Sequence, residues 1–311
     1  MDIESTLWFA VDALWLATLM CWAANLWWVF DLASHFRQQY LLAAVLVAAW
    51  ALIAGFWYLA VLALLAALPH LLEVLRTAQP ADLPQARQGG IPFRLATFNL
   101  AYPNHNAATV DRYVAELEPD LLLLQEADLD WPGPRSGERL HHACQALKTT
   151  GDHLFLLSRW PFTAWMKARS ASTGTPLIVA RVEIAGQAVT VVNFHAASPK
   201  TGAKARFRNL HFRDLAARMA EIEGPKIIAG DFNCSPWSPY YRELVEALNM
   251  VNVAQGRAWF WTWPAAAFCF GIPIDHVLVS RHFSVRSLSR GPRLGSDHLP
   301  IIADLELRPL A

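Results

Sequence analysis

The sequence predicts an α/β protein in which two packed β-sheets are covered by helices, preceded by an N-terminal transmembrane helical region. Three observations support this fold class. The first 75 residues contain two long apolar stretches, the rest of the chain contains many short strand-like runs, and only a few segments with helical periodicity separate those runs. With so many strands and so few helices, two packed sheets are more natural than one wound sheet.

The N-terminal region contains two apolar stretches, residues 7–30 and 41–72. As α-helices they would extend about 36 Å and about 48 Å, against a hydrocarbon core of about 30 Å. The first is too long and too rich in Trp for a signal peptide, so we expect it to be retained. The second is either one tilted helix or two shorter helices that fold back near Gly55. We therefore predict a transmembrane anchor over residues 1–75, with two helices or three.

Composition restricts the class of protein. Hydrophobic residues make up 54% of the chain, and the formal net charge is zero. The part after residue 80 carries only a small excess of basic residues, which falls short of the surface of a dedicated nucleic-acid binder. Of four cysteines, one lies in the apolar region and three lie outside it with no metal-like spacing. The sequence therefore predicts no disulfide framework.

The remaining chain divides into a linker and a single domain. Residues 76–92 are rich in Pro, Gly, Gln and Ala without apolar periodicity, so we expect a linker there, followed by one α/β domain over residues 93–311. Helical spacing appears at 110–117 and 210–222, and Ser238 before Pro239 marks the start of a third helix. Eight runs are typical of strands: 93–100, 120–126, 153–158, 177–184, 188–195, 226–233, 274–280 and 300–307.

Polar residues occur where several predicted strands end. Asp231 and Asn233 are two residues apart, so in an extended chain they project from the same face. Each such residue has a structural explanation, as a turn cap or a hydrogen-bonded histidine. Their joint occurrence instead favours an oxygen-ligated Mg²⁺ site with a general acid/base centre. The residues are Asn99, Glu126, His195, Asp231, Asn233, Asp275, His276, Asp297 and His298.

The order of these motifs resembles a known family. "LATFNL", "PDLLLLQE", "VVNFHA", "IIAGDFN", "IDHVLV" and "GSDHLPIIADLEL" follow one another between residues 93 and 308. This pattern resembles the endonuclease/exonuclease/phosphatase superfamily, which includes deoxyribonuclease I. The resemblance implies a four-layer sandwich of two packed mixed β-sheets flanked by helices. It also implies a hydrolase of phosphate esters that uses Mg²⁺, with Mn²⁺ as a substitute.

The resemblance assigns a role to each matched residue. It implies that Glu126 is the principal Mg²⁺ ligand, with Asn99 and Asp297 close to the metal. It also implies that Asp231 orients or deprotonates the attacking water. The residues that would bind phosphoryl oxygens are Asn233 and His195, and His298, held by Asp275, would complete the acid/base set.

Two segments bear on the substrate. Residues 198–214 contribute Lys200, Lys204, Arg206, Arg208 and Arg213 directly after His195, and they would attract an anionic substrate or form the solvated face of a helix. Residues 258–273 contain six large aromatic residues. That segment either covers the core or forms an apolar rim that meets a bilayer or an acyl chain.

Three functional hypotheses follow. The first is a membrane-anchored phosphoesterase or phosphodiesterase acting on a phosphate ester, with a lipid-linked one as the favoured case. The second is a membrane-tethered nuclease acting on nucleic acid, and the third is a non-catalytic membrane scaffold. Apart from substrate and bilayer, no protein partner is predicted. The apolar region resembles the bacterial membrane-anchored branch that includes a vancomycin-resistance-associated membrane protein. That resemblance implies a multi-pass protein of the inner membrane with an extracytoplasmic domain, although the soluble thiols favour the opposite side.

Overall fold

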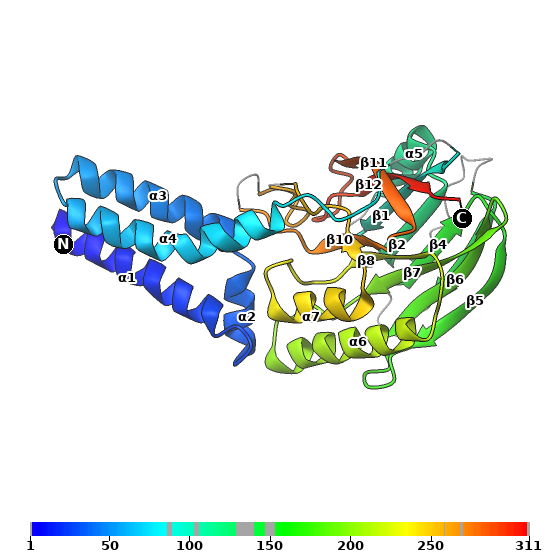
Figure 1. Ribbon diagram of the computed structural model, residues 1–311, viewed down its shortest axis with the longest axis horizontal. Helices are drawn as coiled ribbons and strands as arrows, with labels where there is room; N and C mark the ends of the chain where they lie inside the picture. The colour runs from blue at the N-terminus through cyan, green and yellow to red at the C-terminus, as the bar shows by residue number, and fades with distance from the viewer. Residues whose placement is uncertain are drawn as a thin grey trace.

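The computed structural model describes residues 2–85, 89–102, 106–128, 140–146, 153–257, 259–267 and 270–309. An elongated bundle of N-terminal helices extends from a β-rich domain (Figure 1). We call residues 3–77 the helical region. The β-rich domain begins at Ile91, two residues before the predicted boundary, and the last helix before it continues through Thr77 into the predicted linker.

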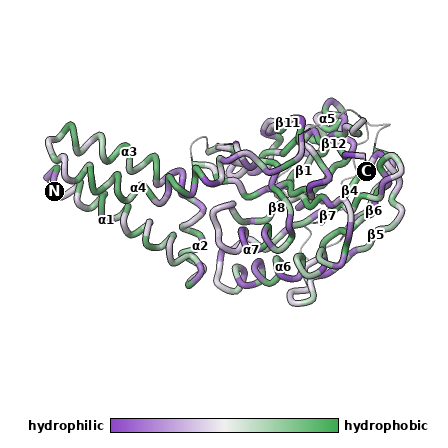
Figure 2. Tube along the Cα trace, viewed as in Figure 1, coloured by the Kyte–Doolittle hydropathy of each residue, from purple (hydrophilic) through white to green (hydrophobic). Residues whose placement is uncertain are grey.

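The helical region consists of four helices: α1 (Ile3–Trp22), α2 (Trp28–Ser34), α3 (Arg37–Ile53) and α4 (Trp57–Thr77). The predicted helix over 7–30 is wrong in its extent, because α1 ends at Trp22. The stretch 41–72 folds back at Gly55, whose φ of 85° suits glycine. Both α1 and α4 are long and apolar enough to cross a membrane, and α2 with α3, bent by 66°, qualifies as a third candidate span. Hydrophobic residues predominate along α1, α3 and α4 (Figure 2).

The β-rich domain is built from two six-stranded mixed sheets within the described residues. One sheet has the order β11-β12-β1-β2-β4-β3 and the other β5-β6-β7-β8-β10-β9. The strands are β1 (Ile91–Asn99), β2 (Leu121–Ala127), β3 (His142–Ala146), β4 (His153–Ser158), β5 (Phe162–Arg169), β6 (Pro176–Ile184), β7 (Gln187–His195), β8 (Lys226–Asp231), β9 (Val251–Asn252), β10 (Asp275–Val279), β11 (Phe283–Arg290) and β12 (Ile301–Leu307). All eight predicted strands are confirmed, and β3, β5, β9 and β11 are additional.

Helices cover the outer face of each sheet. α5 (Ala107–Leu117) packs through Val110 and Val114 on the first sheet, whereas α6 (Gly202–Ala220) and α7 (Pro239–Leu248) cover the second. The largest apolar cluster lies between the sheets and includes Leu123, Val191 and Ile227. The predicted four-layer sandwich is therefore confirmed.

A buried polar bridge joins the two sheets. Asn193 of β7 donates from Nδ2 to the carbonyl oxygens of Leu124 (2.9 Å) and Phe155 (2.8 Å), on β2 and β4. Its Oδ1 accepts from Gln125 Nε2 at 2.7 Å. Asn193 and Gln125 are fully buried. Because a buried polar group without a partner is costly, this bridge fixes one alignment of the sheets.

The helical region also contacts the β-rich domain directly. α2 lies beside α6 (Figure 1), and Asp31 of α2 forms an ion pair with Arg208 of α6 at 2.5 Å. Further bonds run from Arg242 to Glu73 (3.2 Å) and from Gln39 Nε2 to the carbonyl oxygen of Gly271 (2.9 Å). The linker is therefore not the sole connection between the two parts.

Asn193→Ala should lower the free energy of unfolding by about 2–5 kcal/mol, because it removes three buried hydrogen bonds between the sheets. Guanidinium unfolding of the purified chain, followed by Trp fluorescence, measures this loss. Asn106→Ala removes an exposed helix cap of α5 and should cost only about 1 kcal/mol. Equal losses in the two variants would contradict the bridging role.

Candidate active site

The candidate active site lies where strands from both sheets converge. β1 ends at Asn99 and β2 carries Glu126 near its end, and these two strands run parallel. In the second sheet, His195 pairs in register with Asp231, and Asp231 pairs with Asp275 on the antiparallel β10. Strand pairing therefore gathers the polar residues at one edge of the sandwich.

Gly230 allows β8 to approach β7 closely. Its φ is 143°, and a Cβ atom at this position would lie 1.9 Å from the carbonyl oxygen of Phe194. Only glycine fits such an approach. As a result, Asp231 follows directly beside His195, with 3.6 Å between Asp231 Oδ2 and His195 Nε2.

Asp231 is the centre of the cluster and is almost completely buried. Its carboxylate accepts hydrogen bonds from Asn99 Nδ2 (3.0 Å) and from the backbone N–H (2.7 Å) and Nδ2 (2.9 Å) of Asn233. Burial, and then the charge of Asp275, raises the pKa of Asp231 above its ordinary value, although His298 opposes the shift. The structure thus brings Asp231 and Asn233 together, but not along an extended chain as their spacing predicts. β8 ends at Asp231, and Asn233 turns back onto it with a φ of 49°.

Glu126 lies at an irregularity of β2. The pairing of β2 with β4 shifts register between Leu124 and Ala127, and Glu126 has a φ of 51°. Its carboxylate accepts from Asn99 Nδ2 at 3.0 Å and lies 3.4 Å from His195 Nε2. A left-handed backbone at an acidic residue is uncommon and is typical of functional sites, where the surroundings hold the strain.

His298 and Asp275 form a buried pair. Nδ1 of His298 donates to Asp275 Oδ2 at 2.9 Å, and its Nε2 lies 3.9 Å from Asp231 Oδ2. Burial by itself would lower the pKa of His298, but the carboxylates of Asp275 and Asp231 outweigh it and raise that pKa well above its usual range. His298 therefore carries positive charge among these carboxylates.

Asp297 lies at the exposed rim of the cluster. Its Oδ2 accepts from the indole N–H of Trp263 at 2.8 Å, and its Oδ1 lies 3.9 Å from His298 Nε2. It lines the same cavity as Glu126 and Asp231. The structure therefore brings eight of the nine candidate residues, all except His276, to one edge of the sandwich, while their individual roles stay predictions.

The cavity over this cluster has a volume of about 760 Å³. One wall carries Glu126, Asp231 and His298. Another wall comes from the helical region, through Leu32, His35 and Phe36. None of these three residues was predicted from the sequence. The available signal was the short segment that contains Asp31 and His35 between two apolar stretches.

The basic segment 198–214 divides into different environments. Lys200 lines the cavity and is exposed, as an anion-attracting residue should be. Arg208 is fully buried and paired with Asp31, so its charge is structural. The remaining basic residues of the segment are exposed on α6, as expected for the solvated face of a helix. They are Lys204, Arg206 and Arg213.

The aromatic segment 258–273 also divides. Trp263 lines the cavity and contacts Asp297, whereas Phe260 packs partly against the core between the sheets. Trp259 and Phe270 are exposed, and Phe268 lies outside the described residues. Of the described aromatic residues in this segment, Trp263 is therefore the one that lines the cavity over the polar cluster.

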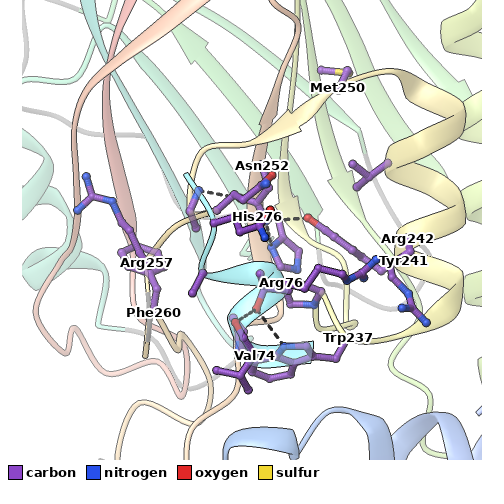
Figure 3. A pocket seen from close by; sticks show the side chains of 18 of the residues that line it. Val74, Arg76, Trp237, Tyr241, Arg242, Met250, Asn252, Arg257, Phe260 and His276 are labelled. Carbon is purple, nitrogen blue, oxygen red and sulfur yellow. Dashed lines mark hydrogen bonds between the residues drawn. The ribbon is translucent and has the colours of Figure 1, made fainter. Parts of the chain in front are cut away.

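His276 occupies a separate environment. Its Nδ1 lies 2.9 Å from Asn252 Nδ2, its Nε2 lies 2.8 Å from the carbonyl oxygen of Cys234, and Asn252 donates to the Tyr241 hydroxyl at 2.7 Å. Burial lowers the pKa of His276 to about 4. Figure 3 shows His276, Asn252 and Tyr241 beside a second cavity. The volume of this cavity is about 510 Å³. His276 is therefore a buried, hydrogen-bonded histidine of the fold, the structural alternative that the sequence left open.

The donor chemistry of the cluster fits a divalent cation. Glu126, His195 and Asp231 bring ligand atoms within 4.8 Å of one another, and so do Asp231, Asp275 and His298. Burial raises the pKa of Asp231 most, and repulsion from the neighbouring carboxylates of Asp275 and Glu126 raises it further. A cation with oxygen ligands would relieve this repulsion.

The predicted metal ligands differ in what they offer. Glu126 presents a partly exposed carboxylate, and Asp297 presents one at the rim. Asn99 turns its amide nitrogen toward Glu126, while its Oδ1 accepts from the backbone N–H of Ala101 at 2.9 Å. In this arrangement Asn99 orients Glu126, and its direct ligation of a metal stays a prediction.

This combination of fold and polar cluster is that of the metal-dependent phosphoester hydrolases as a class. A family model described as the Endonuclease/Exonuclease/phosphatase family matches residues 96–298, so the chain belongs to that family. The match begins within β1 and ends at His298, and it therefore includes every predicted site residue.

Two relatives are similar to this chain, one over nearly all of its own length and the other over about two thirds. A UPF0294 protein of Vibrio cholerae is 26% identical over 298 residues, which cover 87% of this chain and 99% of the relative. A UPF0294 protein of Vibrio vulnificus is 28% identical over 202 residues, which cover 60% of this chain and 67% of the relative. Neither bears on the membrane-anchored branch, which stays a prediction.

Solved structures share the fold. An endonuclease/exonuclease/phosphatase of Bacteroides vulgatus has a TM-score of 0.58 at 23% identity, covering 70% of this chain and 99% of its own. The human Nocturnin catalytic domain with bound sulfate has a TM-score of 0.58 at 21% identity, covering 74% and 98%. A Neisseria 3′ phosphatase, NExo, bound to a product DNA hairpin has a TM-score of 0.55 at 20% identity, covering 68% and 98%.

If Glu126 is the principal Mg²⁺ ligand as predicted, Glu126→Gln should weaken Mg²⁺ binding by about tenfold or more, because a neutral amide replaces a carboxylate. Calorimetric titration of Mg²⁺ into the detergent-solubilised chain measures the affinity. Glu116→Gln on the exposed face of α5 is the matched control and should leave it unchanged. Undiminished affinity in Glu126→Gln would exclude Glu126 as the principal ligand.

Proposed function

We propose that this protein is a membrane-anchored, Mg²⁺-dependent phosphoesterase or phosphodiesterase that hydrolyses a lipid-linked phosphate ester. One observation carries the proposal. The cavity over the carboxylate and histidine cluster is also walled by Leu32, His35 and Phe36, which lie between two apolar helices. A substrate in this cavity would place its phosphate at the cluster and its remainder against a segment at the base of the proposed membrane spans.

The chain's own residues account for the hydrolytic step. A water molecule attacks phosphorus, Asp231 accepts its proton, and the ester P–O bond breaks. The leaving alkoxide takes a proton from solvent and departs as the alcohol. Asn233 and His195 donate hydrogen bonds to the phosphoryl oxygens, and the positive charge of His298, held by Asp275, stabilises the developing negative charge.

The metal would be held chiefly by Glu126, with Asp297 and Asn99 beside it. When bound, Mg²⁺ supplies neutralisation of the phosphate charge, and Mn²⁺ would substitute for it. The oxygen-rich donor set supports this assignment.

The membrane assignment rests on the helical region. α1 and α4 have the length and composition of spans, and α2 with α3 adds a third candidate. We propose a multi-pass protein of the bacterial inner membrane with its β-rich domain on the extracytoplasmic side. The match to the Vibrio cholerae relative covers 87% of this chain and therefore extends into the helical region.

A nuclease activity is the second candidate. It is supported by Lys200 in the cavity and by the DNA hairpin bound to the Neisseria 3′ phosphatase, a protein of the same fold. Cleavage of plasmid DNA at increasing salt concentration distinguishes a nuclease from a lipid phosphoesterase, because nucleic-acid binding weakens steeply with salt. A non-catalytic scaffold would hydrolyse none of the substrates.

Asp231→Asn should lower kcat by about 10²- to 10⁴-fold with little change in KM, because it keeps the shape of the site but removes the base that prepares the water. Steady-state hydrolysis of a short soluble phosphodiester measures both constants. Asp304→Asn is the matched control, since Asp304 pairs with Arg94 away from the cluster. Equal turnover in the two variants would make Asp231 only a turn residue.

Phe36→Ser should depress hydrolysis of a long-chain phospholipid in micelles about tenfold more than hydrolysis of a short soluble phosphodiester, because only the long-chain substrate uses the apolar wall. Trp259→Ser is the matched control, because Trp259 is exposed and does not line the cavity. Equal losses on both substrates would contradict a lipid-linked substrate. Salt-sensitive cleavage of plasmid DNA, with no hydrolysis of the lipid, would favour the nuclease.

A further inference from the structure

The loop of residues 232–238 connects β8 to α7 and carries the candidate catalytic residue Asn233. It contains no helix or strand, so its shape depends on side-chain contacts. Residues of the helical region bond to three positions of this loop, although they precede it by at least 160 positions in the sequence. This concentration of contacts on one loop calls for a functional explanation.

Asp31 makes the most buried of these contacts. Its Oδ1 accepts from Ser238 Oγ at 2.6 Å, and its Oδ2 accepts from Arg208 Nη2 at 2.5 Å. Arg208 Nη1 in turn lies 3.4 Å from the carbonyl oxygen of Asn233. The side chains of Asp31 and Arg208 are 1% and 0% exposed, so each charge depends on the other for compensation. A continuous path of contacts therefore runs from Asp31 to the backbone of Asn233.

Ser238 makes its contact with the helical region through its side chain. It is the N-cap of α7, as the sequence predicts, and a serine there usually caps the helix with its side chain. Here the side chain makes no cap hydrogen bond, and its hydroxyl donates to Asp31. The side chain of Ser238 is therefore directed toward the helical region and not toward the start of α7.

His35 and Thr77 bond to the middle of the loop. His35 Nδ1 accepts from the backbone N–H of Ser235 at 3.2 Å and lies 2.7 Å from its Oγ. The indole N–H of Trp237 donates to Thr77 Oγ1 at 3.2 Å, a bond drawn at the base of the second cavity in Figure 3. Successive parts of the loop are therefore fixed by α2, by the turn after it and by the end of α4.

We propose that the helical region is part of the catalytic apparatus, in which Asp31 and His35 are positioning residues that fix the 232–238 loop and hold Asn233 against Asp231. The proposal rests on the hydrolytic role of Asp231 and Asn233 proposed above. Neither positioning residue needs to touch the substrate to act, because displacement of a reacting group by about 1 Å can cost about 10²-fold in rate.

Glu73 supplies a matched control. It joins the helical region to the β-rich domain through Arg242 of α7 at 3.2 Å, so its loss weakens the same interface. Neither residue of that pair belongs to the 232–238 loop. If Asp31 positions the loop, Asp31→Asn should impair catalysis and Glu73→Gln should not. If both residues only hold the helical region against the β-rich domain, the two variants should behave alike.

The kinetic test uses the full chain in detergent micelles with bis(4-nitrophenyl) phosphate and Mg²⁺. Asp31→Asn and His35→Ala should each lower kcat about tenfold or more with KM within about twofold, whereas Glu73→Gln should leave both constants within about twofold. This substrate has no acyl chain, so a loss cannot come from the apolar wall. Equal kcat values in Asp31→Asn and Glu73→Gln would overturn the proposal.

The double variant Asp31→Asn/Arg208→Gln separates positioning from stability. Loss of Asp31 alone leaves a buried guanidinium without its partner, whereas removal of both charges should restore the melting temperature. The double variant should still show the low kcat, because the contact of Arg208 with Asn233 is lost. Recovery of kcat together with the melting temperature would reduce Asp31 to a structural role.

Hydrogen exchange gives a readout that does not depend on activity. Amides of residues 232–238 should exchange about tenfold faster or more in Asp31→Asn than in Glu73→Gln. Unchanged exchange would overturn the positioning role. If the unsubstituted chain hydrolyses no phosphodiester but Asp31→Asn still loosens the loop, positioning is supported and the proposed function fails.

Discussion

The hydrogen bonds that Asn193 makes with Gln125, Leu124 and Phe155 are the constraint on which the rest of the β-rich domain depends. They cross an otherwise apolar interface, where a shift of either sheet would leave several polar groups unpaired. Gln125 directly precedes Glu126, and Asn193 lies two residues before His195. The same bonds that align the sheets therefore also set the distance between the two groups of polar residues at their edge.

The predictability of the strands follows their place in the sheets. The eight predicted strands are all interior, where burial on both faces produces continuous apolar runs. The four additional strands, β3, β5, β9 and β11, are the sheet edges. β5 exposes most of its residues and β9 has only two, so neither shows the periodicity that identifies a strand.

The candidate site was predictable for a similar reason. Its residues lie at the ends of interior strands, after or just before an apolar run, so the sequence marks them by the change between apolar and polar residues. The contacts between Asp31 and Arg208 were not predictable, because the two residues are 177 positions apart and no local pattern pairs them. Arg208 also resembles the exposed basic residues around it on α6, and only its burial distinguishes it. Long-range pairing of this kind requires the tertiary structure.

The separation of Asp31 and Arg208 along the chain has a consequence for biosynthesis. At about 5–20 residues per second, roughly 10 to 35 s pass between translation of the carboxylate and translation of its guanidinium partner. During that interval the acidic side chain has no basic counterpart and must stay hydrated. The ion pair that docks α2 on the β-rich domain can therefore form only after α6 has left the ribosome.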